Sequence, residues 1–469
     1  MPAGNAGTAR RDYREADGSR GRPSGARVAD DSIGPAPRPG AEMRHSTWVG
    51  RARTLALGLT GLALVVSGST ARGSEAMSRA PNPSKTPTLF LSPTGSDSGP
   101  CTRARPCASF MRAYRSARAG AVVELAAGTY PHQQIEPGPS KSGNEVVTFR
   151  PAPGAAVDVA GVLVEGGTSH VALEDMKFTG PWEVGRNDGG PRATDVTFRR
   201  IRGTQFYIMN ASKIRVLGGI YGPAVDGQSQ IKVWNPDDAY APEDILVQGV
   251  RFHDFTRANG RHTECLQIYA GIDVTVRGNY FRNCDGTGSL TVVRLFAAPV
   301  RNVLVENNMF ESGDGVDDPY YDVQTDVCTD RVVFRYNSFT KGLLINDCPG
   351  EPSGAMTILG NYGVASLYSV CGRASVTYGY NVWVGDEAGR CGPTDRVRRR
   401  AQFKDPKGKN LHLDAGASAI NAGDPRSFPR TDIDGTRRPV GARPDAGADE
   451  ALPSTCRRGA KAPPGKTCS

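Results

Sequence analysis

Apolar residues recur along this chain in short alternating phrases. One phrase, DVTVRGNYF at 273–281, returns 29 residues later as NVLVENNMF at 302–310 and again as RVVFRYNSF at 331–339. Alternation with a period of two is typical of a strand with one buried face. A fixed period of this length indicates a solenoid, in which each coil buries its apolar face only by stacking on its neighbours. The pattern therefore predicts stacked β-coils.

A column of asparagines accompanies the repeat. Each lies five residues after the first apolar residue of its phrase, at Asn279, Asn308, Asn337, Asn361 and Asn381. Asparagine accepts the dihedrals of tight turns, and stacked asparagine side chains can hydrogen-bond along a ladder of strands. We interpret this column as scaffold.

Two further segments carry a resemblance to a known superfamily. The stretch 89–130 contains a first strand, a short helix expected near 106–118 and the coil VVELAAGTY, and 410–450 contains TDIDGTRRP and PDAGADE. With the repeat, this sequence resembles secreted proteins of the pectin-lyase-like superfamily, and its end resembles their choice-of-anchor Q region. The resemblance implies an all-β, right-handed parallel β-helix over 88–450 with a short N-terminal capping helix. It implies little about chemistry, because this fold serves many activities.

The C-terminal region contains its own cluster of charged residues. We expect a C-terminal cap at about 401–450, in which Asp432, Asp434 and Arg437 form a structural network.

Composition and charge favour one long exported domain. Arg44, Arg51 and Arg53 precede the apolar residues 54–66, which predicts a signal peptide over 43–76. A transmembrane anchor is the alternative, although the apolar run is short for a membrane span. We interpret 1–42 as a disordered or mis-assigned extension, 77–87 as a linker and 451–469 as a basic tail.

The net charge of +9 lies almost entirely in the two terminal stretches, 1–76 and 451–469. A nucleic-acid-binding protein would carry its basic excess on the folded domain, so nucleic acid is not an expected partner. We predict a secreted monomer, either free or associated with the cell surface, that has no membrane partner after signal removal.

The ten cysteines fall in sequence-local pairs, as expected for disulfides in an exported protein. These pairs are Cys101/Cys107, Cys265/Cys284, Cys328/Cys348, Cys371/Cys391 and Cys456/Cys468. In the β-helix that the resemblance implies, equivalent positions on neighbouring coils lie within disulfide reach. We predict nearest-neighbour pairing, with Cys348–Cys371 as an alternative because three cysteines share a column.

The strands that precede each phrase hold the residues that break the repeat. We align them on their final turn as QFYIMN (205–210), QIKVWN (230–235), CLQIYA (265–270), VVRLFA (292–297) and VQTDVC (323–328). The second and fourth positions are apolar, including Val293 and Leu295, and should face inward, so the third and fifth face outward. The third column reads Tyr207, Lys232, Gln267, Arg294 and Thr325, and the fifth reads Met209, Trp234, Tyr269, Phe296 and Val327.

Exposed aromatic rings beside cationic and amide groups indicate a carbohydrate-binding surface. The alternative is a covering loop that turns the aromatic side chains into a small satellite core. The expected ligand-binding residues are Tyr207, Trp234, Tyr269, Phe296, Asp322 and Gln324.

A set of titratable groups extends this surface. For β-elimination on a uronic acid, Arg294 would neutralise the carboxylate, Lys232 or His262 would be the base and Tyr269 the acid. Glu264 and Gln267 complete the catalytic candidates. Two alternatives stay open: glycoside hydrolysis by Glu264 and Asp322, and glycan binding without catalysis.

The loop ESGDGVDDPYYD (311–322) brings together Asp314, Asp317 and Asp318. Oxygen-rich loops can hold Ca²⁺, and a cation would suit an acidic substrate. The spacing fits no EF-hand, so the alternative is a solvated acidic loop.

Overall fold

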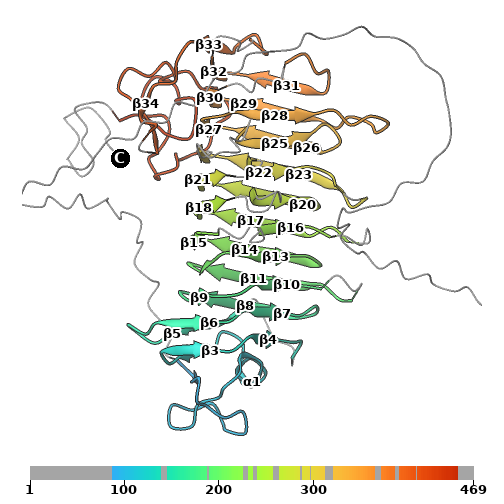
Figure 1. Ribbon diagram of the computed structural model, residues 1–469, viewed down its shortest axis with the longest axis vertical. Coiled ribbons are helices and arrows are strands. Elements are labelled where there is room, and N and C mark those ends of the chain that lie inside the picture. Colours follow the sequence, from blue (N-terminus) through green and yellow to red (C-terminus); the bar gives the residue numbers. More distant parts are fainter. Residues whose placement is uncertain are drawn as a thin grey trace, which may run out of the picture. The chain divides into compact units, whose positions relative to one another are not determined.

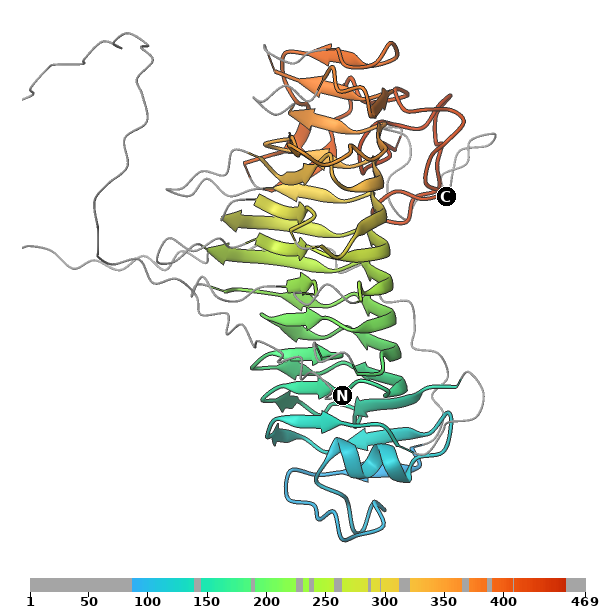
Figure 2. The ribbon, with the colours of Figure 1, turned by 90° about the vertical axis from the view of Figure 1, so that its right-hand side faces the viewer.

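The computed structural model describes residues 87–138, 145–186, 190–224, 231–235, 240–256, 264–285, 288–295, 297–311, 321–364, 371–385, 390–407 and 409–452. Within these residues, successive coils stack along one axis, and their strands form three long parallel sheets (Figures 1 and 2). Every strand pair within the three sheets is parallel, which makes the fold a right-handed parallel β-helix, as predicted. No helix in this part of the chain is long and apolar enough to cross a membrane.

Sheet I has twelve strands. They are β1 (Leu89–Leu91), β2 (Val122–Leu125), β5 (Val147–Pro151), β8 (Ser169–Glu174), β11 (Ala193–Arg199), β14 (Ala211–Leu217), β17 (Glu243–Gln248), β20 (Gly271–Arg277), β23 (Val300–Glu306), β26 (Asp330–Arg335), β29 (Met356–Leu359) and β31 (Val376–Gly379). The apolar phrases of the repeat form this sheet.

Sheet II has nine strands. They are β4 (Gln133–Ile135), β7 (Val162–Val164), β10 (Trp182–Val184), β13 (Phe206–Ile208), β16 (Ile231–Val233), β19 (Glu264–Ile268), β22 (Gly288–Val292), β25 (Val323–Asp326) and β28 (Leu343–Asn346). These strands precede the phrases and carry the candidate site residues.

Sheet III has twelve strands. They are β3 (Gly128–Tyr130), β6 (Val157–Val159), β9 (Lys177–Phe178), β12 (Arg202–Gly203), β15 (Ile220–Tyr221), β18 (Arg251–Thr256), β21 (Tyr280–Asp285), β24 (Met309–Glu311), β27 (Ser338–Phe339), β30 (Tyr362–Val364), β32 (Val382–Val384) and β33 (Arg396–Arg398). An antiparallel pair, β34 (Phe403–Asp405) and β35 (Asn410–Leu413), follows in the C-terminal segment.

The interior of the helix consists of apolar side chains stacked in columns. Phe252, Phe281, Phe310 and Phe339 stack with ring centroids 4.7, 4.7 and 5.5 Å apart. The helix α1 (Phe110–Ser116) covers the N-terminal end of this core with the buried residues Phe110, Ala113 and Tyr114. This position confirms the predicted helix near 106–118 that caps the solenoid, and the Ser109 side chain accepts a hydrogen bond from Arg112 N at the start of α1.

The asparagine column forms the turn between sheets I and III. Asn308 Nδ2 donates to Val276 O and to Asn337 Oδ1, at 2.9 and 3.0 Å, while its own Oδ1 accepts from Asn279. The ladder ends at Asp395, whose carboxylate accepts from the backbone and side chain of Asn381 at 3.0 and 3.1 Å. The scaffold interpretation of these asparagines is confirmed.

Disulfides join neighbouring positions as predicted. The pairs are Cys101–Cys107, Cys265–Cys284, Cys328–Cys348 and Cys371–Cys391, with Cα–Cα distances between 4.6 and 5.8 Å. The Cys348–Cys371 alternative is therefore wrong. Cys456 and Cys468 lie outside the described residues. Multiple disulfides are typical of exported proteins.

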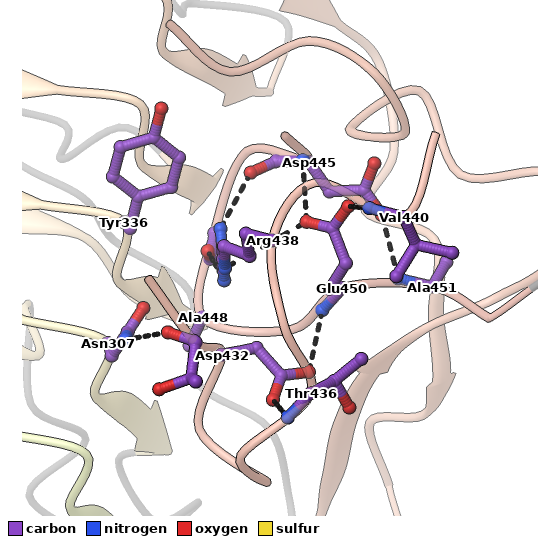
Figure 3. A network of polar contacts seen from close by, with 12 residues as sticks. Asn307, Tyr336, Asp432, Thr436, Arg438, Val440, Asp445, Ala448, Glu450 and Ala451 are labelled. Carbon is purple, nitrogen blue, oxygen red and sulfur yellow. Dashed lines mark hydrogen bonds and ion pairs between the residues drawn. The ribbon is translucent and has the colours of Figure 1, made fainter. Parts of the chain in front are cut away.

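The C-terminal segment, residues 400–452, lies along the flank of sheet III (Figure 1). Its apolar residues pack against Met309, Tyr362 and Val382 of that sheet. Asn307 Nδ2 donates to Thr431 O at 2.6 Å, which ties the segment to the helix at a turn (Figure 3). The region expected as a cap thus covers a side of the solenoid.

A buried polar network holds this segment together (Figure 3). Arg438 donates to the carbonyl oxygens of Asp445 and Gly447 at 3.0 and 2.8 Å, and its side chain is fully buried. Asp432 accepts from the backbone of Asp434 and Thr436. The expected network exists, but Arg438 is its buried arginine, not the neighbouring Arg437.

Candidate functional site

The outer face of sheet II brings together several of the predicted site residues. Lys232 lies opposite Tyr207 on one side and opposite Gln267 on the other, in the parallel pairing of β13, β16 and β19. The flanking residues Ile231 and Val233 are fully buried in the core. Alternation therefore directs the Lys232 side chain outward, as predicted.

The predicted third column departs from the structure after Gln267. The residue opposite Gln267 is Thr291, and the residue opposite Thr291 is Gln324. Arg294 and Thr325 therefore do not belong to this column. The prediction aligned the strands on their final turns, and the connection after β22 is longer than the one after β19, which displaced the alignment.

The same displacement affects neighbouring positions. Val292 faces the core, Val293 is half-buried and Leu295 is 58% exposed, so the predicted inward pair Val293 and Leu295 was wrong. Thr325 is fully buried on the inner side, and Val327 is buried. Met209 is also buried, at 9% exposure.

Tyr207 on β13, Lys232 on β16 and Trp234 directly after β16 form a cationic and aromatic surface near the middle of sheet II. The Lys232 ammonium lies 5.1 Å from the ring centroid of Trp234. The ring of Tyr207 lies 6.3 Å from that of Trp234, at an angle of 50°. All three side chains are half-buried. An ammonium over an aromatic face is stabilised as a cation, so Lys232 presents positive charge beside two ring faces.

A different group of side chains occupies the next coils. Gln267 Nε2 donates to the Glu264 carboxylate, and both residues are almost fully buried. On a neighbouring coil, the Tyr321 hydroxyl donates to Gln324 Oε1 at 2.8 Å. Tyr321 itself packs on Gly288, where a Cβ atom would lie only 2.8 Å from its ring. Tyr321 was not predicted as a site residue, because it precedes β25 and lies outside the strand pattern.

The two tyrosines of this group remain neutral at ordinary pH. Burial, followed by the negative charge of Glu264, raises the pKa of Tyr269. The same two causes raise the pKa of Tyr321 to about 12. Both phenols therefore keep their protons and are hydrogen-bond donors, and a phenol with a raised pKa is a weak acid unless its anion is stabilised.

Two buried polar atoms on this face have no hydrogen-bond partner among the residues that the structure describes. They are Gln267 Oε1 and Thr291 Oγ1, whose residues are 1% and 3% exposed. The residues are direct neighbours on β19 and β22. Buried polar atoms are nearly always hydrogen-bonded, so these two are available to a ligand or a water molecule.

Asp322 is placed differently from its prediction. It is fully buried, and its carboxylate accepts hydrogen bonds from the backbone N–H groups of Thr340, Lys341 and Gly342 at 2.6, 2.7 and 3.2 Å. This carboxylate organises the turn of the following coil. Asp322 therefore does not join the outer face, whereas Gln324 does.

Arg294 lies in the connection that follows β22. Its guanidinium pairs with Glu351 at 3.2 Å, and its backbone N–H donates to Asp326 Oδ2 at 3.0 Å. Burial raises the pKa of Asp326. The structure thus gives Arg294 an acidic partner that the sequence pattern did not indicate.

Some predicted site residues lie outside the described residues. These are His262, Phe296, Asp314, Asp317 and Asp318, so the predicted Ca²⁺ loop and the histidine base remain predictions. Among the described residues, His412, Asp434 and Asp449 form one group with potential metal-ligating atoms within 4.8 Å of one another. Both ring nitrogens of His412 are already engaged, by Asn410 at 2.6 Å and by Asp434 at 2.8 Å. The second such group contains Cys328 and Cys348, which form a disulfide.

No protein-family model matches the chain, and no curated protein matches its sequence. Several solved structures are similar to it. XylC in complex with xylose has a TM-score of 0.45 and 9% identity, with 78% of this chain and 98% of the other covered. Pectate lyase Pel9A has a TM-score of 0.41 and 13% identity, with 78% and 96% covered. The PL6 alginate lyase AlyGC has a TM-score of 0.39 and 14% identity, with 68% and 58% covered. At these identities the likeness concerns the fold alone.

Proposed function

We propose that the protein binds an acidic, uronic-acid-containing polysaccharide along the outer face of sheet II and cleaves it by β-elimination. The observation that carries this proposal is the Lys232 ammonium at 5.1 Å from the Trp234 ring, with Tyr207 beside it. Aromatic faces accept the C–H faces of sugar rings, and the ammonium pairs with a carboxylate.

The roles in the elimination follow from this arrangement. Lys232 neutralises the uronate carboxylate, which makes the adjacent C5 proton easier to remove. Glu264, on the next coil, accepts that proton as the C4–O bond breaks and the C4–C5 double bond forms. Tyr269 then donates its proton to the leaving oxygen and recovers one from Glu264, whose charge acts on the same phenol. Arg294, the neutraliser expected from the sequence pattern, is paired with Glu351 and has no role here.

The test is a lyase assay on purified protein from residue 77 onward. Pectate, alginate, hyaluronan and glucuronan are incubated with it, with and without Ca²⁺, and unsaturated products are followed by ultraviolet absorbance. We expect Glu264→Gln to lower the rate at least about a hundredfold while binding persists, as loss of a general base does. Lys232→Ala should weaken both binding and cleavage.

Lys177→Ala is the matched control, because Lys177 is exposed on sheet III. It should change neither binding nor rate. Full activity of Glu264→Gln on the preferred polymer would contradict the assignment of the base.

A second candidate function is glycan binding without catalysis. The observation that favours it is the Lys232–Trp234 contact, which holds the lysine as a cation and suits binding more than proton abstraction. Under this function no polymer yields unsaturated product, and Trp234→Ala abolishes binding while Glu264→Gln leaves it intact.

A further inference from the structure

Successive coils of the sheet II face would bind different ligand groups: one coil carries a cation, and the next two carry neutral hydrogen-bonding groups. The coil of β16 presents the Lys232 ammonium over the Trp234 ring. The coils of β19 and β22 carry the buried acceptor Gln267 Oε1 and the buried hydroxyl of Thr291, and neither atom has a partner within the described part of the chain. A sugar chain that crosses these coils therefore meets a cationic site first and a hydroxyl-binding site next.

The orientation of the Gln267 amide is fixed by its neighbour. Its Nε2 donates to the Glu264 carboxylate, so its Oε1 can only accept. A ligand group that satisfies Oε1 must be a donor. Sugar hydroxyls and amide N–H groups are donors, whereas a carboxylate is not.

Charge leads to the same conclusion. Glu264 is 3% exposed, and its negative charge raises the pKa of both Tyr269 and Tyr321. The carboxylate of the cleaved uronate is neutralised by Lys232, but the carboxylate of a further uronate beside Glu264 would add uncompensated like charge in a poorly solvated place, which is unfavourable. The neighbouring Thr291 hydroxyl is neutral and both donates and accepts.

We infer that the ligand is a heteropolysaccharide in which each uronate is followed by an uncharged sugar, and that Gln267 and Thr291 form the subsite for the uncharged unit. Neighbouring strands are about 4.8 Å apart, a spacing close to the length of one sugar unit, so consecutive sugar units can contact consecutive coils. This inference rests on the proposed function, because it takes the Lys232 site as the uronate site.

The inference is tested by comparing two polymers that share one uronic acid. Oligosaccharides of hyaluronan alternate glucuronate with an uncharged N-acetylated sugar, and those of glucuronan are glucuronate throughout. Titration calorimetry on the Tyr269→Phe protein, which lacks the proposed acid but keeps the Glu264 carboxylate, measures binding with cleavage suppressed. We expect hyaluronan oligosaccharides to bind at least about tenfold more tightly, since sites built around hydrogen bonds discriminate strongly.

Thr291→Val should reduce that preference to less than about threefold by weakening only the mixed oligosaccharide, because valine keeps the shape and removes the hydroxyl. Thr275→Val is the matched control, since Thr275 faces outward on sheet I and should leave the preference unchanged. Gln267→Met provides a second variant with the same expected effect.

The outcomes separate the two claims. Equal binding of both polymers, with loss of both in Lys232→Ala, overturns this inference and leaves the proposed function standing. A preference that Thr291→Val and Gln267→Met do not alter also overturns it, because the two buried atoms then bind water only. Failure of hyaluronan, glucuronan, pectate and alginate alike to bind refutes the proposed function as well.

Discussion

At Asn308 all the hydrogen-bonding capacity of a buried amide is used within the protein. Its Nδ2 donates to Val276 O and Asn337 Oδ1, and its Oδ1 accepts from the backbone and side chain of Asn279, both at 2.9 Å. Gln267 differs, because its amide nitrogen is engaged and its oxygen is not. The same functional group is thus saturated where it supports the coil and open where the outer face of sheet II can meet a ligand.

Replacement of Asn308 by alanine should destabilise the protein by about 2–4 kcal/mol, because buried donors and acceptors on both neighbouring coils lose their partners. Chemical denaturation followed by circular dichroism measures this change. Gln248→Ala is the control, since Gln248 is exposed on sheet I and should cost no more than about 0.5 kcal/mol. A decrease of less than about 1 kcal/mol in the free energy of unfolding of Asn308→Ala would contradict a stabilising role of the asparagine ladder.

Residue positions on the outer face were predictable where a single apolar alternation marks the strand, whereas β22 is followed by a second one, Val293 and Leu295, that suggests another register. Tyr207, Lys232 and Gln267 could be placed from alternation alone, and the structure confirms their column. The next position could not, because the sequence pattern shows strand periodicity but not the length of an irregular connection. Thr291 therefore took the place that the pattern assigned to Arg294.

At the scale of elements, the C-terminal segment 400–452 combines an apolar contact with sheet III and a buried polar network. Within that network Asp445 and Glu450 lie close together: the Glu450 carboxylate accepts from Asp445 N at 3.0 Å. Burial, and then the charge of Glu450, raises the pKa of Asp445 to about 7. The buried Arg438 lies 3.8 Å from the Glu450 carboxylate, and its positive charge partly offsets the rise in the pKa of Asp445. Two buried carboxyl groups, those of Asp445 and Glu450, therefore share the positive charge of the buried Arg438 in this network.

This element should be more tightly attached at pH 5 than at pH 8. A carboxyl group whose pKa is raised from 3.8 in the folded state stabilises folding most below that value, and the contribution is lost as the pH rises to about 7. Hydrogen exchange of residues 410–452, corrected for the intrinsic rate, should show weaker protection at pH 8. In Asp445→Asn the difference between the two pH values should shrink, and an unchanged difference would assign it to another group.

At the scale of the whole molecule, the fold is a linear stack whose disulfides bridge near neighbours. Sequence separations within the four pairs are 6, 19, 20 and 20 residues. The repeat predicted this architecture, since one period fixes the coil length and the buried face together. It did not predict where residues 400–452 would lie, because that segment lacks the period and its position depends on side-chain contacts with sheet III.

Peptide mapping of the oxidised protein without reduction should find five nearest-neighbour disulfides, the fifth joining Cys456 and Cys468. Local pairs close short loops, and a bridge of 19 residues such as Cys265–Cys284 should contribute about 3 kcal/mol. Thermal unfolding with and without reductant measures the combined contribution. A Cys348–Cys371 peptide, or a melting temperature that reductant leaves unchanged, would contradict this prediction.

The asparagine ladder has a direction, and its last member is an acid. From Asn279 to Asn361 each amide in the column donates to the next asparagine toward the C-terminal end, and Asn381 donates to Asp395, whose second oxygen accepts from Trp383 Nε1 at 3.2 Å. A carboxylate has no N–H group to pass onward, so a further coil placed above it would find acceptors without donors. Solenoids with open ends tend to join end to end. We therefore expect Asp395 to disfavour end-to-end assembly of the solenoid, and Asp395→Asn to promote it.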